Sequence, residues 1–219
     1  MFGRSNNRKE RRHFQSYGRS GVSVLLALAL VAVIGAAYAG TVSLPQTGQT
    51  TSYDANTPQR DDGALRVGVA WPNPRFTDNS DGTVTDNLTG LMWTKNANLP
   101  GGTKTWQQAL DYVASMNSGA GTYGYTDWRL PNINELESLV NAGQTNHATW
   151  LNEQGFINVQ SYSYWTSTFN ANYASFPFSG WAVEIHTCKI GSAGKSDPNL
   201  YVWPVRHGES GAFNNSFVW

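Results

Sequence analysis

Short alternating runs separated by turn residues begin the densely patterned part of the chain. The run TDNSDGTV at residues 77–84 is nearly repeated by TDNLTGLM at residues 85–92. Asp-Gly at 81–82 and Thr-Gly at 89–90 favour tight turns, and the residues between these turns suit strands. The pattern therefore predicts a β-meander of short strands.

Apolar residues at helical spacing predict two helices after the meander. The first is expected from Thr105, which can cap its start, to Met116. Its buried face is expected to hold Trp106, Leu110, Val113 and Met116. The second is expected over residues 132–141, because Asn132 and Glu135 have the spacing of a capping box.

The last third of the chain has the pattern of strands joined by long polar loops. Strands are predicted at residues 164–168, 181–186 and 201–206, with loops rich in Gly, Ser and Asn at 169–180 and 187–199. Long loops on a rigid frame commonly carry binding residues. A meander, two helices and a later group of strands together predict an α+β fold with a mainly antiparallel sheet.

The N-terminal segment has the three parts of a secretion signal. A basic region precedes an apolar run at residues 22–37, and Ala37-Tyr38-Ala39 provides a small-residue exit. The alternative is an uncleaved membrane anchor, although the run is shorter than the roughly 20 residues that a spanning helix needs. We expect a secreted, periplasmic or cell-surface protein. The expected order is a signal peptide at 1–39, an extended lead-in at 40–70, a domain at 71–208 and an aromatic tail at 209–219.

Cleavage after Ala39 would change the charge of the protein. The whole chain has 15 basic and 15 acidic residues, and the leader holds six of the basic ones but only Glu10 among the acidic ones. The remaining nine basic and fourteen acidic residues give a formal charge of −5. An acidic domain has no global electrostatic attraction to nucleic acid, so no nucleic-acid partner is expected.

Cysteine and tryptophan usage indicates how the domain is stabilised. Cys188 is the only cysteine, so an exported form of this chain can contain no internal disulfide. Nine tryptophans, all after the leader, predict an aromatic core in place of cross-links. Homo-oligomerisation remains open.

An ordered set of motifs resembles one known family over about residues 44–208. The motifs are RFTDN at 75–79, DGTVTD at 81–86, TGLMW at 89–93, DWRLPN at 127–132, EL at 135–136, YWTST at 164–168 and VR at 205–206. They resemble the Lcl C-terminal domain family, and the step at 127–132 also resembles C-type lectin-like and sulfatase-modifying-factor folds. The resemblance implies an exported surface or matrix module, because the family includes the trimeric, glycosaminoglycan-binding end of a Legionella collagen-like adhesin.

Loop composition favours binding over catalysis. Sugars present C–H faces that stack on aromatic rings and hydroxyls that bond to polar side chains. We therefore expect a non-catalytic adhesion module that binds a glycan or an extracellular protein through residues 169–199, with Trp181 in the core. The candidate ligand-binding residues are Tyr173, Phe176, Phe178, Lys189, Lys195 and Asp197.

Two alternatives to this interpretation have specific residues behind them. The chain could be a structural subunit of a surface assembly that docks through its apolar end, Phe213 to Trp219. It could instead be a glycoside hydrolase that uses Glu184 and Asp197, provided that the two acids lie roughly 5 to 10 Å apart.

The remaining polar residues fit structural roles better than chemistry. Trp128 would face away from its strand neighbours and Arg129 could pair with a carboxylate. The expected structural residues are Asp127, Trp128, Arg129 and Arg206. The acids of the meander fit turn capping, although calcium remains open, and a helical calcium loop is excluded because Leu88 occupies the position of its last acid. The histidines have no metal-ligand spacing, and no nucleophile motif surrounds Cys188, so neither a metal bound by histidine nor an enzyme is expected.

Overall fold

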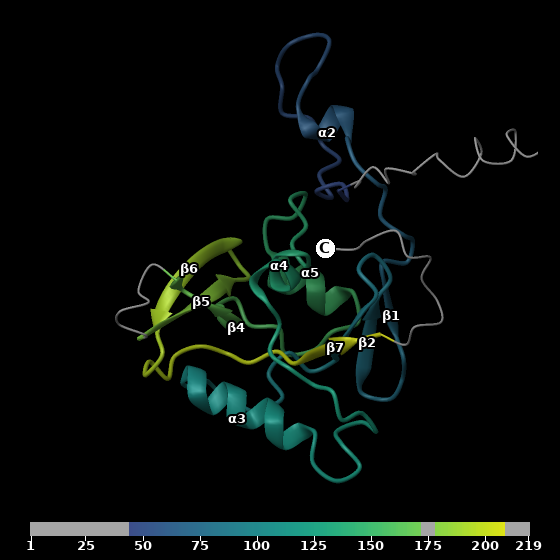
Figure 1. The fold of residues 1–219 in the computed structure, drawn as a ribbon. Coiled ribbons are helices and arrows are strands. Elements are labelled where there is room, and N and C mark those ends of the chain that lie inside the picture. Colours follow the sequence, from purple (N-terminus) through teal and green to yellow (C-terminus); the bar gives the residue numbers. More distant parts are fainter. Residues whose placement is uncertain (1–43, 172–177, 209–219) are drawn as a thin grey trace, which may run out of the picture. The chain divides into compact units, whose positions relative to one another are not determined.

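Two antiparallel sheets and several short helices make up the described part of the chain, an α+β architecture as expected (Figure 1). The structure, a computed structural model, describes residues 44–171 and 178–208. The helices are α2 (Asp62–Leu65), α3 (Trp106–Met116), α4 (Ile133–Glu137) and α5 (His147–Glu153), and none of these is long and apolar enough to cross a membrane. The strands are β1 (Phe76–Asp78), β2 (Thr83–Asp86), β3 (Leu91–Thr94), β4 (Ser163–Phe169), β5 (Ser179–Glu184), β6 (Lys189–Gly194) and β7 (Val205–His207).

The predicted meander forms the first sheet, whose strand order is β1-β2-β3-β7. Gly82 and Gly90 lie in its two turns with φ of 94° and 74°, a conformation that glycine adopts without the penalty a side chain would add. The last strand, β7, returns from far along the sequence and pairs with β3, placing Val205 opposite Trp93. The strand that begins in the second copy of the repeated motif, β3, therefore pairs with the last strand of the domain, β7.

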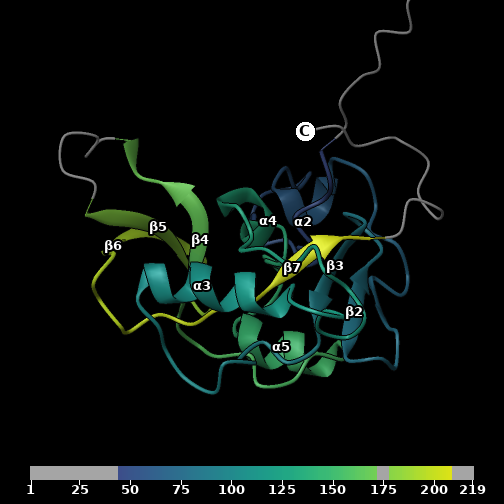
Figure 2. The same ribbon diagram turned by 60° about the horizontal axis from the view of Figure 1, so that its bottom comes forward.

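The second sheet has the order β4-β5-β6, and α3 lies across it (Figure 2). The expectation of a polar loop at 187–199 was wrong, because β6 pairs with β5 along its whole length. Within 187–199, only the turn that leads into β6 and the residues after Gly194 are loop. Much of the expected binding region at 169–199 is therefore the β5–β6 hairpin. β6 is an edge strand with almost every residue exposed, and it therefore lacks the alternation of apolar residues that identifies a half-buried strand.

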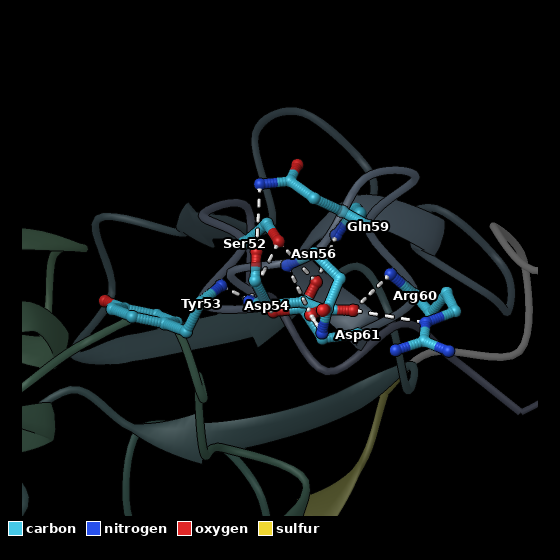
Figure 3. A network of polar contacts seen from close by, with 8 residues as sticks. Ser52, Tyr53, Asp54, Asn56, Gln59, Arg60 and Asp61 are labelled. Atoms are coloured by element: carbon cyan, nitrogen blue, oxygen red, sulfur yellow. Dashed lines mark hydrogen bonds and ion pairs between the residues drawn. The ribbon is translucent and has the colours of Figure 1, made fainter.

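Several element boundaries differ from the sequence-based prediction. The second helix ends at Glu137, well before residue 141, and the predicted strand at 201–206 enters a ladder only at Val205. The lead-in was expected to be extended, but it holds the short helix α2. There, Asp61 accepts hydrogen bonds from the side chain of Ser52 and the backbone N–H of Tyr53 and Ala64 (Figure 3). These bonds lower the pKa of the Asp61 carboxyl below its ordinary value.

Tryptophan rings fill the core in place of disulfides. Trp203 is fully buried and packs edge-on against Trp93 and Phe156, with centroid distances of 5.4 and 5.0 Å. Its Nε1–H donates to the Thr94 carbonyl oxygen at 2.9 Å, so the indole satisfies its donor while its ring is removed from water. A second cluster around Trp165 and Trp128 packs beneath α3.

The substitution Trp203→Ala should destabilise the domain by about 3–5 kcal/mol, because it removes a fully buried ring and leaves a cavity between β3 and the second sheet. The control Tyr162→Ala removes an exposed ring and should change the free energy of unfolding by about 0.5 kcal/mol or less. Urea unfolding followed by tryptophan fluorescence measures both. Equal destabilisation by the two substitutions would contradict this packing.

Candidate binding site at the edge of the second sheet

Two aromatic rings, Trp106 and Phe169, and the lysine Lys195 gather on the α3 side of the second sheet, and the backbone of Phe178 bonds to Lys195. Phe169 ends β4 opposite Gly180 of β5, after a register shift that follows Trp165. A side chain at Gly180 would come within 3.1 Å of the Trp106 ring, so this glycine leaves room for the first residue of α3. Trp106 is fixed there because its Nε1–H donates to the Thr166 carbonyl oxygen at 2.9 Å.

Lys195 joins these rings from the residue after β6. Its Nζ lies 4.0 Å from the Trp106 ring centroid and 4.6 Å from that of Phe169, within the range of cation–π attraction. Its backbone N–H donates to the Phe178 carbonyl oxygen, and its own carbonyl accepts from the Trp106 N–H at 3.0 Å. We refer to Trp106, Phe169, Phe178 and Lys195 as the aromatic–lysine cluster.

The outer part of this cluster is open to solvent. Phe178 is 66% exposed and Phe169 is 36% exposed, whereas the other described phenylalanines, Phe76 and Phe156, are buried. Phe178 lies directly before β5, and its carbonyl oxygen accepts a hydrogen bond from the Lys195 N–H, so the exposed ring belongs to a residue beside this lysine. The arrangement presents apolar ring surface next to a cation that is already held in place, which suits a ligand with C–H faces and oxygen acceptors.

The structure brings together two of the six predicted ligand-binding residues, Phe178 and Lys195. Tyr173 and Phe176 lie outside the described residues. Lys189 lies opposite Glu184 at the other end of β6, and Asp197 accepts a hydrogen bond from the side chain of Asn199 in the turn that follows the strand.

Trp106 and Phe169 were not predicted as site residues. Helical periodicity assigned Trp106 to the buried face of its helix. It does lie on that face, but it is the first residue of the helix and its side chain is only partly buried. Phe169 lay one residue beyond the predicted strand. Trp181, which was expected in the core, is only partly buried, because it faces away from the side on which Gly180 and Ala182 pack. The pairing of β4, β5 and β6, together with the packing of α3 against them, brings the cluster together, and no local signal encodes these contacts.

The residues with expected structural roles make ion pairs and hydrogen bonds around the segment at 127–132. Arg129 donates to both carboxylate oxygens of Glu135 at 2.7 and 2.6 Å, and the same carboxylate caps α4 at Asn132. Arg206 donates to Asp127 at 2.6 Å. Trp128 is buried, and its Nε1–H donates to the Thr122 carbonyl oxygen. These contacts join the motif at 127–132 to α4 and β7.

Acidic residues of the meander are occupied by contacts within the fold. Asp86 forms a buried ion pair with Arg75, Asp78 bonds to Lys95 at 2.6 Å, and Asp81 accepts from the Thr83 backbone. Asp78 and Asp86 also accept hydrogen bonds from the backbone N–H groups of Ser80 and Leu88, so these acids cap turns as predicted from sequence. Within 44–171 and 178–208, no group of three or more His, Cys, Asp and Glu side chains could hold a metal ion.

The acid pair of the alternative hydrolase lies at opposite ends of a strand. Glu184 is paired with Lys189 at the start of β6, whereas Asp197 follows the end of this strand. Six extended residues span about 16 Å or more, which exceeds the roughly 5 to 10 Å that a glycosidase pair needs. The geometry therefore argues against Glu184 and Asp197 as a catalytic pair.

A cysteine–histidine contact, which the sequence did not reveal, lies at the turn between β5 and β6. Cys188 Sγ is 3.4 Å from Nδ1 and 3.3 Å from Nε2 of His147, so it approaches both ring nitrogens equally. Burial, followed by the negative charges of Glu137 and Glu184, raises the pKa of the Cys188 thiol. The group is therefore held in its neutral form, which is the opposite of what an activated nucleophile requires.

Comparison with known families matches the chain to an adhesin-associated domain. Residues 82–206 match the Lcl C-terminal domain family, and because this match covers more than half of the 219 residues, the chain belongs to that family. The matched segment begins in the turn before β2 and ends in β7, so it includes all of the second sheet and the aromatic–lysine cluster. A search of curated proteins found no match.

Alkylation of Cys188 should be slower in the folded chain than in urea at pH 8, because the raised pKa leaves less thiolate in the fold. The difference should shrink as the pH rises through the folded-state pKa. The rate of iodoacetamide labelling, followed by mass spectrometry, measures it. Faster labelling in the folded state at neutral pH would show an activated thiol and contradict this assignment.

Proposed function

We propose that this protein is an exported surface-adhesion module that binds a glycan through the aromatic–lysine cluster. The single observation that carries the proposal is the exposure of Phe169 and Phe178 beside Lys195, in a domain whose other described phenylalanines, Phe76 and Phe156, are buried. Family membership supports the adhesive role, and the chemistry of the aromatic–lysine cluster favours a glycan as the ligand.

The chemistry of the cluster supports a sugar over a flat protein surface. Aromatic rings offer C–H stacking with the apolar face of a pyranose, and the neighbouring ammonium can donate to ring or hydroxyl oxygens. Trp106 and Phe169 hold Lys195 in one position, so less side-chain entropy is lost when a ligand binds. Binding therefore depends on a site that exists before the ligand arrives.

Export and domain limits are part of the same proposal. Residues 1–39 act as a signal peptide, and the binding domain spans 71–208 after the lead-in at 40–70. The protein is then secreted, periplasmic or on the cell surface, which is where an adhesion module meets its partners. The C-type lectin-like resemblance remains a prediction.

Phe169→Ala and Phe178→Ala should each weaken the affinity for the glycan on an array by about tenfold or more. Aromatic residues central to a binding site commonly contribute at least about 2 kcal/mol to binding. Lys195→Met keeps most of the stem's apolar contact but removes the charge, so it separates stacking from donation by the ammonium. Tyr162→Ala is the matched control, because Tyr162 is 54% exposed and lies at the opposite end of β4. This variant should bind the glycan as the unaltered chain does.

Two results would overturn parts of this proposal. Failure of the unaltered chain to bind any glycan, together with capture of a defined extracellular protein that depends on Phe178, would replace the glycan with a protein partner. Unchanged binding in both phenylalanine variants would remove the cluster from the site. Circular dichroism of each variant excludes loss of fold as the cause.

A further inference from the structure

A hollow formed by residues other than those of the aromatic–lysine cluster lies between the lead-in and the α4 region. Its volume is about 290 Å³. Four stretches of the chain form its walls, and most of the surface that they present is apolar. The lining residues are Pro45, Gln46, Thr47, Trp71, Leu88, Thr89, Glu137, Ser138, Val140 and Ala142. We refer to this hollow as the lead-in groove.

Hydrogen bonds between the segments fix the walls of the lead-in groove. Trp71 Nε1–H donates to the Gln46 carbonyl oxygen at 2.6 Å, and the Ala142 N–H donates to the Thr47 carbonyl oxygen at 2.9 Å. Gly48 packs so closely against Trp71 and Asn141 that a side chain there would overlap both. The groove is therefore a formed feature of the fold and not a gap between loose segments.

A buried guanidinium lies directly beneath the lining. Arg75 is 5% exposed, its Cζ lies 4.1 Å from the Trp71 ring centroid, and it pairs with Asp86. It also donates to the Ser138 carbonyl oxygen, so it contacts two residues of the groove wall. Its Nη1 has no hydrogen-bond partner among the described residues, which leaves one unmet donor beside an apolar hollow.

The described chain stops at the rim of this groove. Gly208 follows β7, and its N–H donates to the Gly90 carbonyl oxygen at 3.0 Å. Gly90 comes directly after Leu88 and Thr89, both of which line the groove. Residues 209–219 lie outside the described part and contain Phe213, Phe217, Val218 and Trp219. Phe213 is the fifth residue after Gly208, so it can reach up to about 17 Å from it.

We propose that the segment Phe213–Trp219 docks in the lead-in groove of its own chain. The groove offers apolar surface at the point where the segment emerges, and the segment carries four large apolar side chains that otherwise need a partner. A tether this short gives an effective concentration on the order of mM, so the same chain outcompetes a second copy in dilute solution.

Disulfide trapping in the full chain tests this docking. With Cys188→Ser as background, Ala142→Cys places a thiol on the exposed groove wall, and Ser216→Cys places one between the apolar residues of the segment. The control pair is Ser192→Cys with Ser216→Cys, because Ser192 is exposed on β6. The groove pair should form an intramolecular disulfide about tenfold faster than the control pair at micromolar protein.

A third variant shows whether the apolar side chains drive the docking. Replacing Phe213, Phe217 and Trp219 together by Ser in the groove-pair chain should reduce the trapping rate to that of the control pair. Equal rates for the groove and control pairs would overturn the proposal. A disulfide-linked dimer in place of the intramolecular product would also overturn it, and would assign the segment to the groove of a second copy.

Discussion

One buried crossing segment determines how the rest of this structure is arranged. Residues 200–207 bond first to Lys104, before α3, then to Ser163 and Trp165 of β4, and finally to β3. Trp203 lies in the middle of this segment, fully buried, with its indole N–H donated to Thr94. Because the same eight residues contact both sheets, the relative position of the sheets depends on burying this one ring without losing its hydrogen bond.

The geometry of the aromatic–lysine cluster depends on that arrangement of the two sheets. Trp106 comes from α3, whereas Phe169, Phe178 and Lys195 come from the second sheet, and the two parts meet because Leu200 bonds to Lys104 two residues before the helix. Backbone bonds between Trp106 and Lys195, and between Lys195 and Phe178, hold the cluster together from within. A domain without disulfides thus presents a formed recognition surface because its frame is rigid. The adhesive role proposed here depends on that rigidity.

The features predicted correctly from sequence are those with local causes. The turns at Gly82 and Gly90 and the caps at Thr105 and Asn132 depend on residues within a few positions, so the meander and the helix starts were found. β6 was missed because an exposed edge strand has no apolar alternation. The contact of His147 with Cys188 and the assembly of the cluster depend on pairings far apart in sequence, and the residue pattern does not encode such pairings.

A nuclear magnetic resonance titration of the domain with a glycan that it binds tests most directly whether the aromatic–lysine cluster is a preformed binding site. The prediction is that the indole N–H signal of Trp106 and the amide signals of residues 169, 178 and 195 shift with a single affinity. The buried indole of Trp203 should stay unchanged, because the site is formed before binding. Shifts confined to residues 45–47 and 140–142, with Trp106 unaffected, would place recognition in the lead-in groove and contradict the account.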